Sequence, residues 1–81
     1  MAFVVWKTLL RDQAGAETGL RRPEGTYGTV EEARAAAEGI AARHRLNIYR
    51  PETGCWIIEG AGRATYIISV EAGAWATDEA A

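Results

Sequence analysis

The chain contains very few of the side chains on which most catalytic and metal sites depend. Its 81 residues include one histidine, His44, and one cysteine, Cys55. Most enzymes need a nucleophile beside a base, a metal with three or four protein ligands, or two carboxylates in different environments. No such motif can be read in the sequence. We therefore expect a protein that is not an enzyme and that uses neither a metal nor a cofactor.

The isolated cysteine and histidine each have a structural interpretation. A single cysteine cannot form an internal disulfide, so the fold does not depend on oxidation. It opens the apolar run Cys55-Trp56-Ile57-Ile58, which indicates a buried thiol. His44 comes at the end of a predicted helix, where a cation-capable side chain is common. The alternative interpretation is that His44 acts as a general base or as a pH switch.

The sequence also lacks long hydrophobic runs. No apolar stretch approaches the roughly 20 residues of a membrane span, and residues 1–10 carry neither a basic leader nor a small-residue cleavage site. We expect a cytoplasmic protein with no membrane partner. The composition, 48% hydrophobic and 25% charged, is typical of globular proteins. It predicts one domain over residues 1–81, with a partly ordered acidic tail at 71–81.

A helix is predicted to follow Thr29 and to continue to His44. Thr29 and Glu32 have the spacing of a capping box, in which the threonine side chain caps the first turn and the glutamate reaches back. The residues that follow are rich in alanine, the strongest helix former. The spacing of Arg34 and Glu38 predicts an ion pair. The narrow apolar stripe predicts close packing on a sheet, through Val30, Ala33, Ala37, Ile40 and Ala41.

Strands are predicted on both sides of this helix. Residues 2–10 are rich in β-formers and apolar on both faces, which is typical of a strand that is covered on both sides or contacts a partner. A short second strand at 20–22 is expected to end at Pro23. After the helix we expect strands at 46–50, 55–59 and 64–70, joined by the turns Pro51-Glu52-Thr53-Gly54 and Gly60-Ala61-Gly62-Arg63.

This order of elements predicts an α+β fold, with an antiparallel sheet of four to five strands and one α-helix packed on one face. Such a sheet has open edges, which recruit further strands by dimerisation or by addition of a partner strand. Residues 64–70 are long and apolar enough to do so if they lie at an edge. We expect a monomer or a homodimer.

The charge is unevenly distributed along the chain. Residues 1–50 carry eight basic and six acidic side chains, whereas residues 51–81 carry one basic and five acidic ones. The five acidic residues can converge into a patch that meets an arginine-rich partner or imitates the phosphates of a nucleic acid. The alternative is a set of scattered, solvated carboxylates. As partner-binding residues we predict Glu52, Glu59, Glu71, Asp78 and Glu79.

Three tryptophans are many for a chain of this length. Trp6 and Trp56 fall in predicted strands and are expected in the core. Trp75 stands in the alanine- and acid-rich tail, where it either folds back onto the domain or is presented to a partner. Tryptophan is enriched at interface hot spots, so Trp75 joins the predicted partner-binding residues.

A second kind of partner is nucleic acid. Arginines in the first half of the chain can form a basic face with tyrosines nearby for base stacking. The net charge of −2 weakens non-specific attraction to phosphates, and no recognition-helix pattern is present. The residues predicted for this alternative are Arg21, Arg22, Arg43, Arg45 and Arg50.

The whole layout also suggests a class of protein. The predicted elements follow one another in a definite order. A strand at 3–10 and a polar loop come first, and a helix opening with Thr29-Val30-Glu31-Glu32-Ala33 follows. Two or three strands then contain Cys55-Trp56-Ile57-Ile58 and Tyr66-Ile67-Ile68. This order resembles several small phage-encoded inhibitor proteins, anti-CRISPR proteins among them. The resemblance is one of size and layout, and it carries no functional residue over.

The resemblance implies a small α+β domain that binds a large effector complex and blocks its nucleic acid or nuclease. Our first hypothesis is therefore a non-catalytic protein-binding module that inhibits an arginine-rich, nucleic-acid-handling complex. The alternatives are a nucleic-acid-binding module that uses the arginines named above and a homo-oligomeric structural or accessory subunit.

Overall fold

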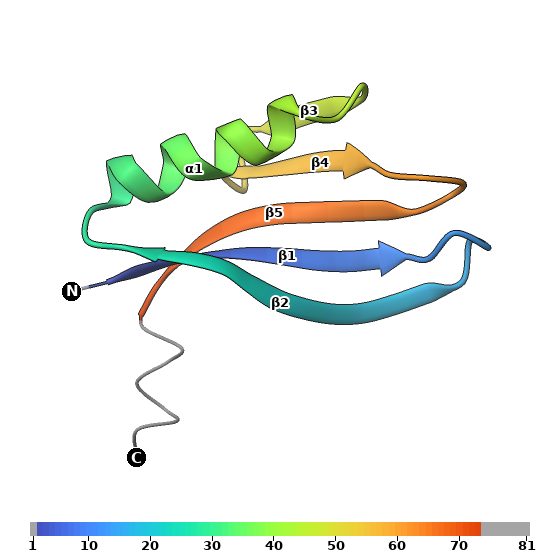
Figure 1. Cartoon of the computed structure of the whole chain (residues 1–81), viewed down its shortest axis with the longest axis horizontal. Coiled ribbons are helices and arrows are strands. Elements are labelled where there is room, and N and C mark those ends of the chain that lie inside the picture. The colour runs from blue at the N-terminus through green and yellow to red at the C-terminus, as the bar shows by residue number, and fades with distance from the viewer. Residues whose placement is uncertain (1, 74–81) are drawn as a thin grey trace, which may run out of the picture.

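The structure, a computed structural model, describes residues 2–73. One helix packs on one face of a five-stranded antiparallel sheet, which confirms the predicted α+β fold (Figure 1). The elements are β1 (Phe3–Arg11), β2 (Glu17–Tyr27), α1 (Val30–Ala42), β3 (Asn47–Arg50), β4 (Cys55–Glu59) and β5 (Thr65–Ala72). The strand order is β2-β1-β5-β4-β3.

The first and last strands pair in the middle of the sheet. Phe3 is opposite Ala72, and Leu9 is opposite Tyr66, so β1 and β5 hold the β1–β2 hairpin against the β3–β4–β5 meander. β5 is therefore a central strand and not an edge, and the open edges belong to β2 and β3. The turn at residues 51–54 is present as predicted: the Gly54 N–H donates to the Arg50 carbonyl at 2.7 Å, and Gly54 has a φ of +68°.

The helix begins as predicted and ends slightly earlier. The Thr29 hydroxyl oxygen accepts a hydrogen bond from the Glu32 backbone N–H at 3.1 Å. The Glu32 carboxylate reaches back to the Thr29 hydroxyl, also at 3.1 Å, and not to the backbone of Thr29. Arg43 forms the C-terminal cap, so the helix ends at Ala42, two residues before the expected His44.

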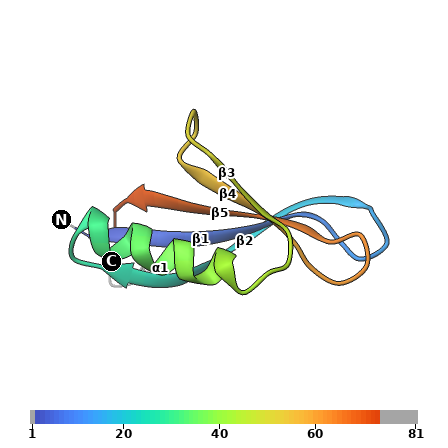
Figure 2. The same ribbon diagram turned by 90° about the horizontal axis from the view of Figure 1, so that it is seen from above.

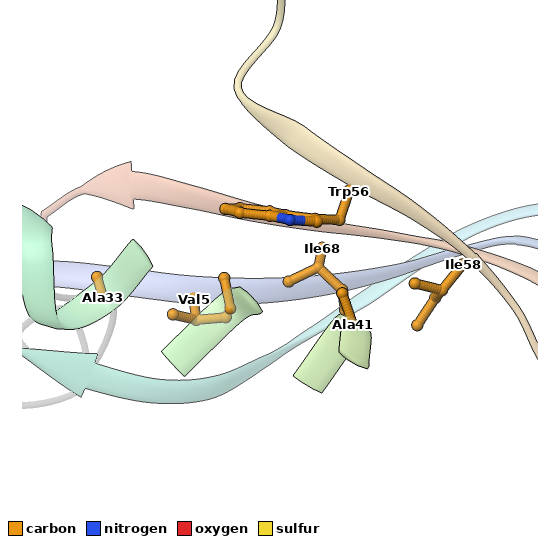
Figure 3. Packing of buried hydrophobic residues seen from close by; sticks show 7 residues of the cluster. Val5, Ala33, Ala41, Trp56, Ile58 and Ile68 are labelled. Carbon is orange, nitrogen blue, oxygen red and sulfur yellow. The ribbon is translucent and has the colours of Figure 1, made fainter. Parts of the chain in front are cut away.

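Alanines bring the helix close to the sheet. Ala33, Ala37 and Ala41 are fully buried, and they pack on side chains from β1, β4 and β5 (Figure 3). These sheet residues are Val5, Trp56, Ile58 and Ile68. Because alanine has only a methyl group, the helix backbone can approach the sheet closely. Val30, which was expected in the apolar stripe, is 36% exposed.

The second strand is longer than its sequence suggests. The prediction that it ends at Pro23 is wrong, because β2 continues through Pro23 to Tyr27. Pro23 pairs with Trp6 beside an irregularity in the β1–β2 ladder. Proline has no N–H to donate, and sheets tolerate it at edges and bulges. β2 is an edge strand, so no further strand lies on its outer side to lose a hydrogen bond through the missing N–H.

The helix covers only one of the two faces of the sheet. Figure 2 shows α1 along one side of the sheet, while the turn between β3 and β4 projects on the other side. We call the second side the helix-free face. Successive residues of a strand point to opposite faces, so Ile58 and Ile68 point to the helix while Ile57 and Ile67 point to the helix-free face.

Candidate protein-interaction surface

The predicted acidic residues within residues 2–73 do not form one patch. Glu52 lies in the turn that precedes β4 and Glu59 ends β4, so they stand at opposite ends of the strand. Glu71, near the end of β5, accepts two hydrogen bonds from the Arg21 guanidinium at 2.9 and 3.3 Å. Its charge is therefore already paired. Trp75, Asp78 and Glu79 lie outside the described residues.

The predicted basic residues divide between the two edges of the sheet. Arg21 and Arg22 belong to β2, whereas Arg50 ends β3. Four strand spacings separate these edges, a distance on the order of 20 Å. Arg43 and Arg45 lie between α1 and β3, where they line an open cavity of about 740 Å³ together with His44 and Leu46, and with Glu59, Gly60 and Ala61. Three of the five arginines thus flank β3, with Arg43 and Arg45 before its start and Arg50 at its end.

His44 and Cys55 are not close enough to act together. A His44 ring nitrogen, Nδ1, lies 3.3 Å from the backbone carbonyl of Glu59, at the end of β4. Cys55 begins the same strand, roughly 14 Å away for a rise of four residues. Among residues 2–73, no three histidine, cysteine, aspartate or glutamate side chains form a group that could hold a metal ion.

The cysteine lies on the helix-free face, which differs from the predicted burial. Cys55 is half-buried, and its thiol donates a hydrogen bond to the Thr53 carbonyl at 3.4 Å. Its neighbour Trp56 points to the opposite face and packs in the core. The Cys55 thiol was expected to be buried, but a strand covered on one face buries only every second side chain.

The helix-free face carries a row of isoleucines that no single segment of the sequence reveals. Ile48 of β3 is opposite Ile57 of β4, and Ile57 is opposite Ile67 of β5. Ile48 is 56% exposed, and the other two are half-buried. Thr8 of β1 continues the row. The alternation within each strand is visible in the sequence, but the register that aligns the three isoleucines is not.

An open groove runs beside this isoleucine row. It has a volume of about 390 Å³ and is lined by Ile57, Ile67 and Cys55, with Thr53, Arg50 and Glu52 completing the lining. The lining therefore combines an apolar floor with one charge of each sign. Interfaces between proteins have this composition, an apolar centre within a polar rim. Glu52 is the one residue of the predicted acidic set that borders the groove.

The other half of the helix-free face is covered by charged side chains. The Arg21 guanidinium stacks on the Trp6 ring, 3.8 Å from the ring centroid, while it binds Glu71. This places the ion pair over Trp6, on the side of the sheet that carries β1 and β2.

The β3 edge adds exposed apolar side chains to the same side of the molecule. Of the five large hydrophobic residues that are exposed within residues 2–73, three lie at or next to β3: Leu46 at 59%, Ile48 at 56% and Tyr49 at 39%. Arg34 of the helix donates to the Tyr49 hydroxyl at 2.8 Å. This contact replaces the predicted pair of Arg34 with Glu38. No local pattern indicates it, because Arg34 and Tyr49 are fifteen positions apart.

The helix found within residues 2–73, 13 residues long, is too short to cross a membrane. Comparisons of the chain with models of protein families, with curated proteins and with solved structures find no match. The isoleucine row, the groove beside it and the exposed β3 edge together form the candidate interaction surface.

Proposed function

We propose that this chain is a non-catalytic protein-binding module that receives an apolar side chain of its partner in the groove of the helix-free face. The observation that carries this proposal is the alignment of Ile48, Ile57 and Ile67 on a face without a covering helix. Contiguous apolar surface on a small protein marks interaction sites.

The narrower form of the proposal concerns the partner. We take it to be a nucleic-acid-handling protein complex that the module inhibits by occupying its surface. Two observations support this form: the resemblance in size and layout to phage-encoded inhibitors, and the position of the Glu52 carboxylate at the groove, where an arginine of such a partner can reach it. Glu71 does not contribute in the same way, because Arg21 already neutralises it.

Cys55 offers a test that leaves the core unchanged. It lines the groove and is the only cysteine of the chain, so a maleimide attaches there alone. Tagged protein, untreated or alkylated with N-ethylmaleimide, is incubated with lysate of the source organism. The captured material is then analysed by mass spectrometry and by nucleic-acid staining. The matched control is Cys55→Ser treated with the same reagent.

We expect one stoichiometric protein partner with the untreated chain and with treated Cys55→Ser, and at least a tenfold loss of it after alkylation of Cys55, which corresponds to about 1.4 kcal/mol. Capture that alkylation does not change would contradict the groove as the binding site. Recovery of nucleic acid alone, with strong salt dependence, would instead favour the arginines around β3, and Arg43→Gln with Arg45→Gln would then abolish it.

A further inference from the structure

The outer side of β3 carries backbone groups that the sheet does not use. The Glu59 N–H donates to the Leu46 carbonyl at 3.2 Å, and the Gly54 N–H donates to the Arg50 carbonyl at 2.7 Å. Residues of an antiparallel strand alternate in the direction of their backbone groups. Residues 46, 48 and 50 therefore direct theirs toward β4, and Asn47 and Tyr49 direct their N–H and C=O groups away from the sheet.

The two edges of the sheet differ in their suitability for pairing. β2 contains Pro23 and a ladder irregularity, and most of its exposed side chains are polar or charged, which are common protections of an edge. β3 contains no proline and shows no irregularity in its pairing with β4. Its exposed side chains include Ile48 and Tyr49. The β3 edge thus lacks the proline and the irregularity that protect β2.

We infer that the β3 edge pairs with the β3 edge of a second copy of this chain, antiparallel about a two-fold axis at Ile48. In this register each outward-facing Asn47 is opposite the outward-facing Tyr49 of the other copy. Four backbone hydrogen bonds therefore form between the two β3 strands. Ile48 of one copy meets Ile48 of the other. The two sheets join into one of ten strands, and the isoleucine rows of the two copies become continuous.

The side chains of the edge are compatible with this symmetric contact. Arg50 of one copy is placed opposite Leu46 of the other, so no two like charges face each other directly. A two-fold axis at Tyr49 would instead place Pro51, which has no N–H, opposite Asn47. The register centred on Ile48 is therefore the one that uses both outward residues within the strand.

Sedimentation of the full chain between about 1 and 500 µM tests whether this dimer forms. A contact through one short strand belongs to the weak class of interfaces, so we expect association in the upper half of that range. Ile48→Asp places two carboxylates opposite each other and should weaken the dimer at least about tenfold. The matched control is Leu20→Asp on β2, because Leu20 is 72% exposed and lies on the other edge, and it should leave the dimer unchanged.

Cross-linking tests the register. Ile48 pairs with itself in a non-hydrogen-bonded position, where Cα atoms are about 4.5 Å apart, within the range that a disulfide bridges. In a Cys55→Ser background, Ile48→Cys should oxidise to a covalent dimer, whereas Leu46→Cys, opposite Arg50, should remain largely monomeric. Both residues are similarly exposed, so a difference between them reports position and not access.

A chain that stays monomeric at 500 µM would overturn the inference, and so would equal cross-linking at positions 46 and 48. This result is separable from the outcome for the proposed function. Alkylation of Cys55 tests the groove whether or not the chain dimerises, and an Ile48→Asp variant that still captures its partner would show that the two contacts are independent.

Discussion

Ile57 and Ile58 are neighbours in β4, and Ile67 and Ile68 are neighbours in β5, yet the members of each pair have different environments. Ile58 and Ile68 are fully buried beneath α1, whereas Ile57 and Ile67 remain half-buried on the helix-free face. The side chains are chemically identical. The position of one helix therefore decides which isoleucine contributes to the core and which is available to a partner.

The two faces also differ in how they are covered. On the helix face, three alanines allow a close contact that excludes water from the isoleucines. On the helix-free face, the cover is the Arg21–Glu71 ion pair over Trp6, and it does not extend to the isoleucine row. The alanine-rich helix thus excludes solvent from the isoleucines of one face, whereas the ion pair covers only part of the other face.

Shortening one isoleucine on each face should separate the two faces most strongly. Ile58→Ala should lower the free energy of unfolding by about 3 to 4 kcal/mol, because it leaves a cavity in a fully buried site. Ile57→Ala should cost roughly 1 kcal/mol, since solvent already reaches that side chain. Urea denaturation followed by tryptophan fluorescence measures both. Equal losses would mean that the helix-free face is covered in solution as well.

A smaller effect is expected from enlarging the alanines of the helix. Ala37→Leu should destabilise the domain by about 1 to 3 kcal/mol, because the fully buried methyl group has no space for a larger side chain. Ala35→Leu is the matched control, since Ala35 is exposed on the same helix and its change should stay within about 0.5 kcal/mol. Thermal unfolding of both variants provides the comparison. If Ala37→Leu were neutral, the close fit of helix and sheet would be refuted.

The smallest effect concerns the ion pair on the helix-free face. A double-mutant cycle with Arg21→Ala and Glu71→Ala should give a coupling of about 0.5 kcal/mol, because both side chains are nearly half exposed and solvent screens them. The coupling should decrease in 1 M salt. In a Trp75→Phe background, where the buried Trp56 is poorly accessible to the quencher, either change should also increase quenching of tryptophan fluorescence by acrylamide, with Arg22→Ala as the control. Unaltered quenching would contradict the assignment of Arg21 as the cover of Trp6.

Local signals in the sequence accounted for a large part of the fold. The capping pair Thr29 and Glu32 located the start of the helix, and the turn at residues 51–54 formed as expected. Pro23 was misinterpreted, because a proline ends a strand only where its missing N–H deprives a neighbour of a hydrogen bond. Its position on an outer strand cannot be recognised from the residues around it.

The candidate surface was less predictable than the fold. Charge and aromatic content predict a site at acidic residues and Trp75, whereas the apolar groove arises from cross-strand register. The pairing of Arg21 with Glu71 joins residues that are 50 positions apart, and it removes one predicted partner-binding carboxylate from the free charges. Contacts of that separation depend on the complete sheet, and neither residue carries a local sign of the other.

Local residue patterns were enough to establish the α+β class, the helix and the alternation of apolar side chains along the strands, because these depend on caps, turns and periodicities of two and 3.6 residues. The tertiary structure decided which face the helix covers, which strands stand at the edges and which isoleucines align. The edges follow from the pairing of β1 with β5, residues that are far apart in the chain, and the alignment of the isoleucines follows from the registers of β3 with β4 and of β4 with β5. Such pairing is selected by the burial of the whole core and not by any local segment.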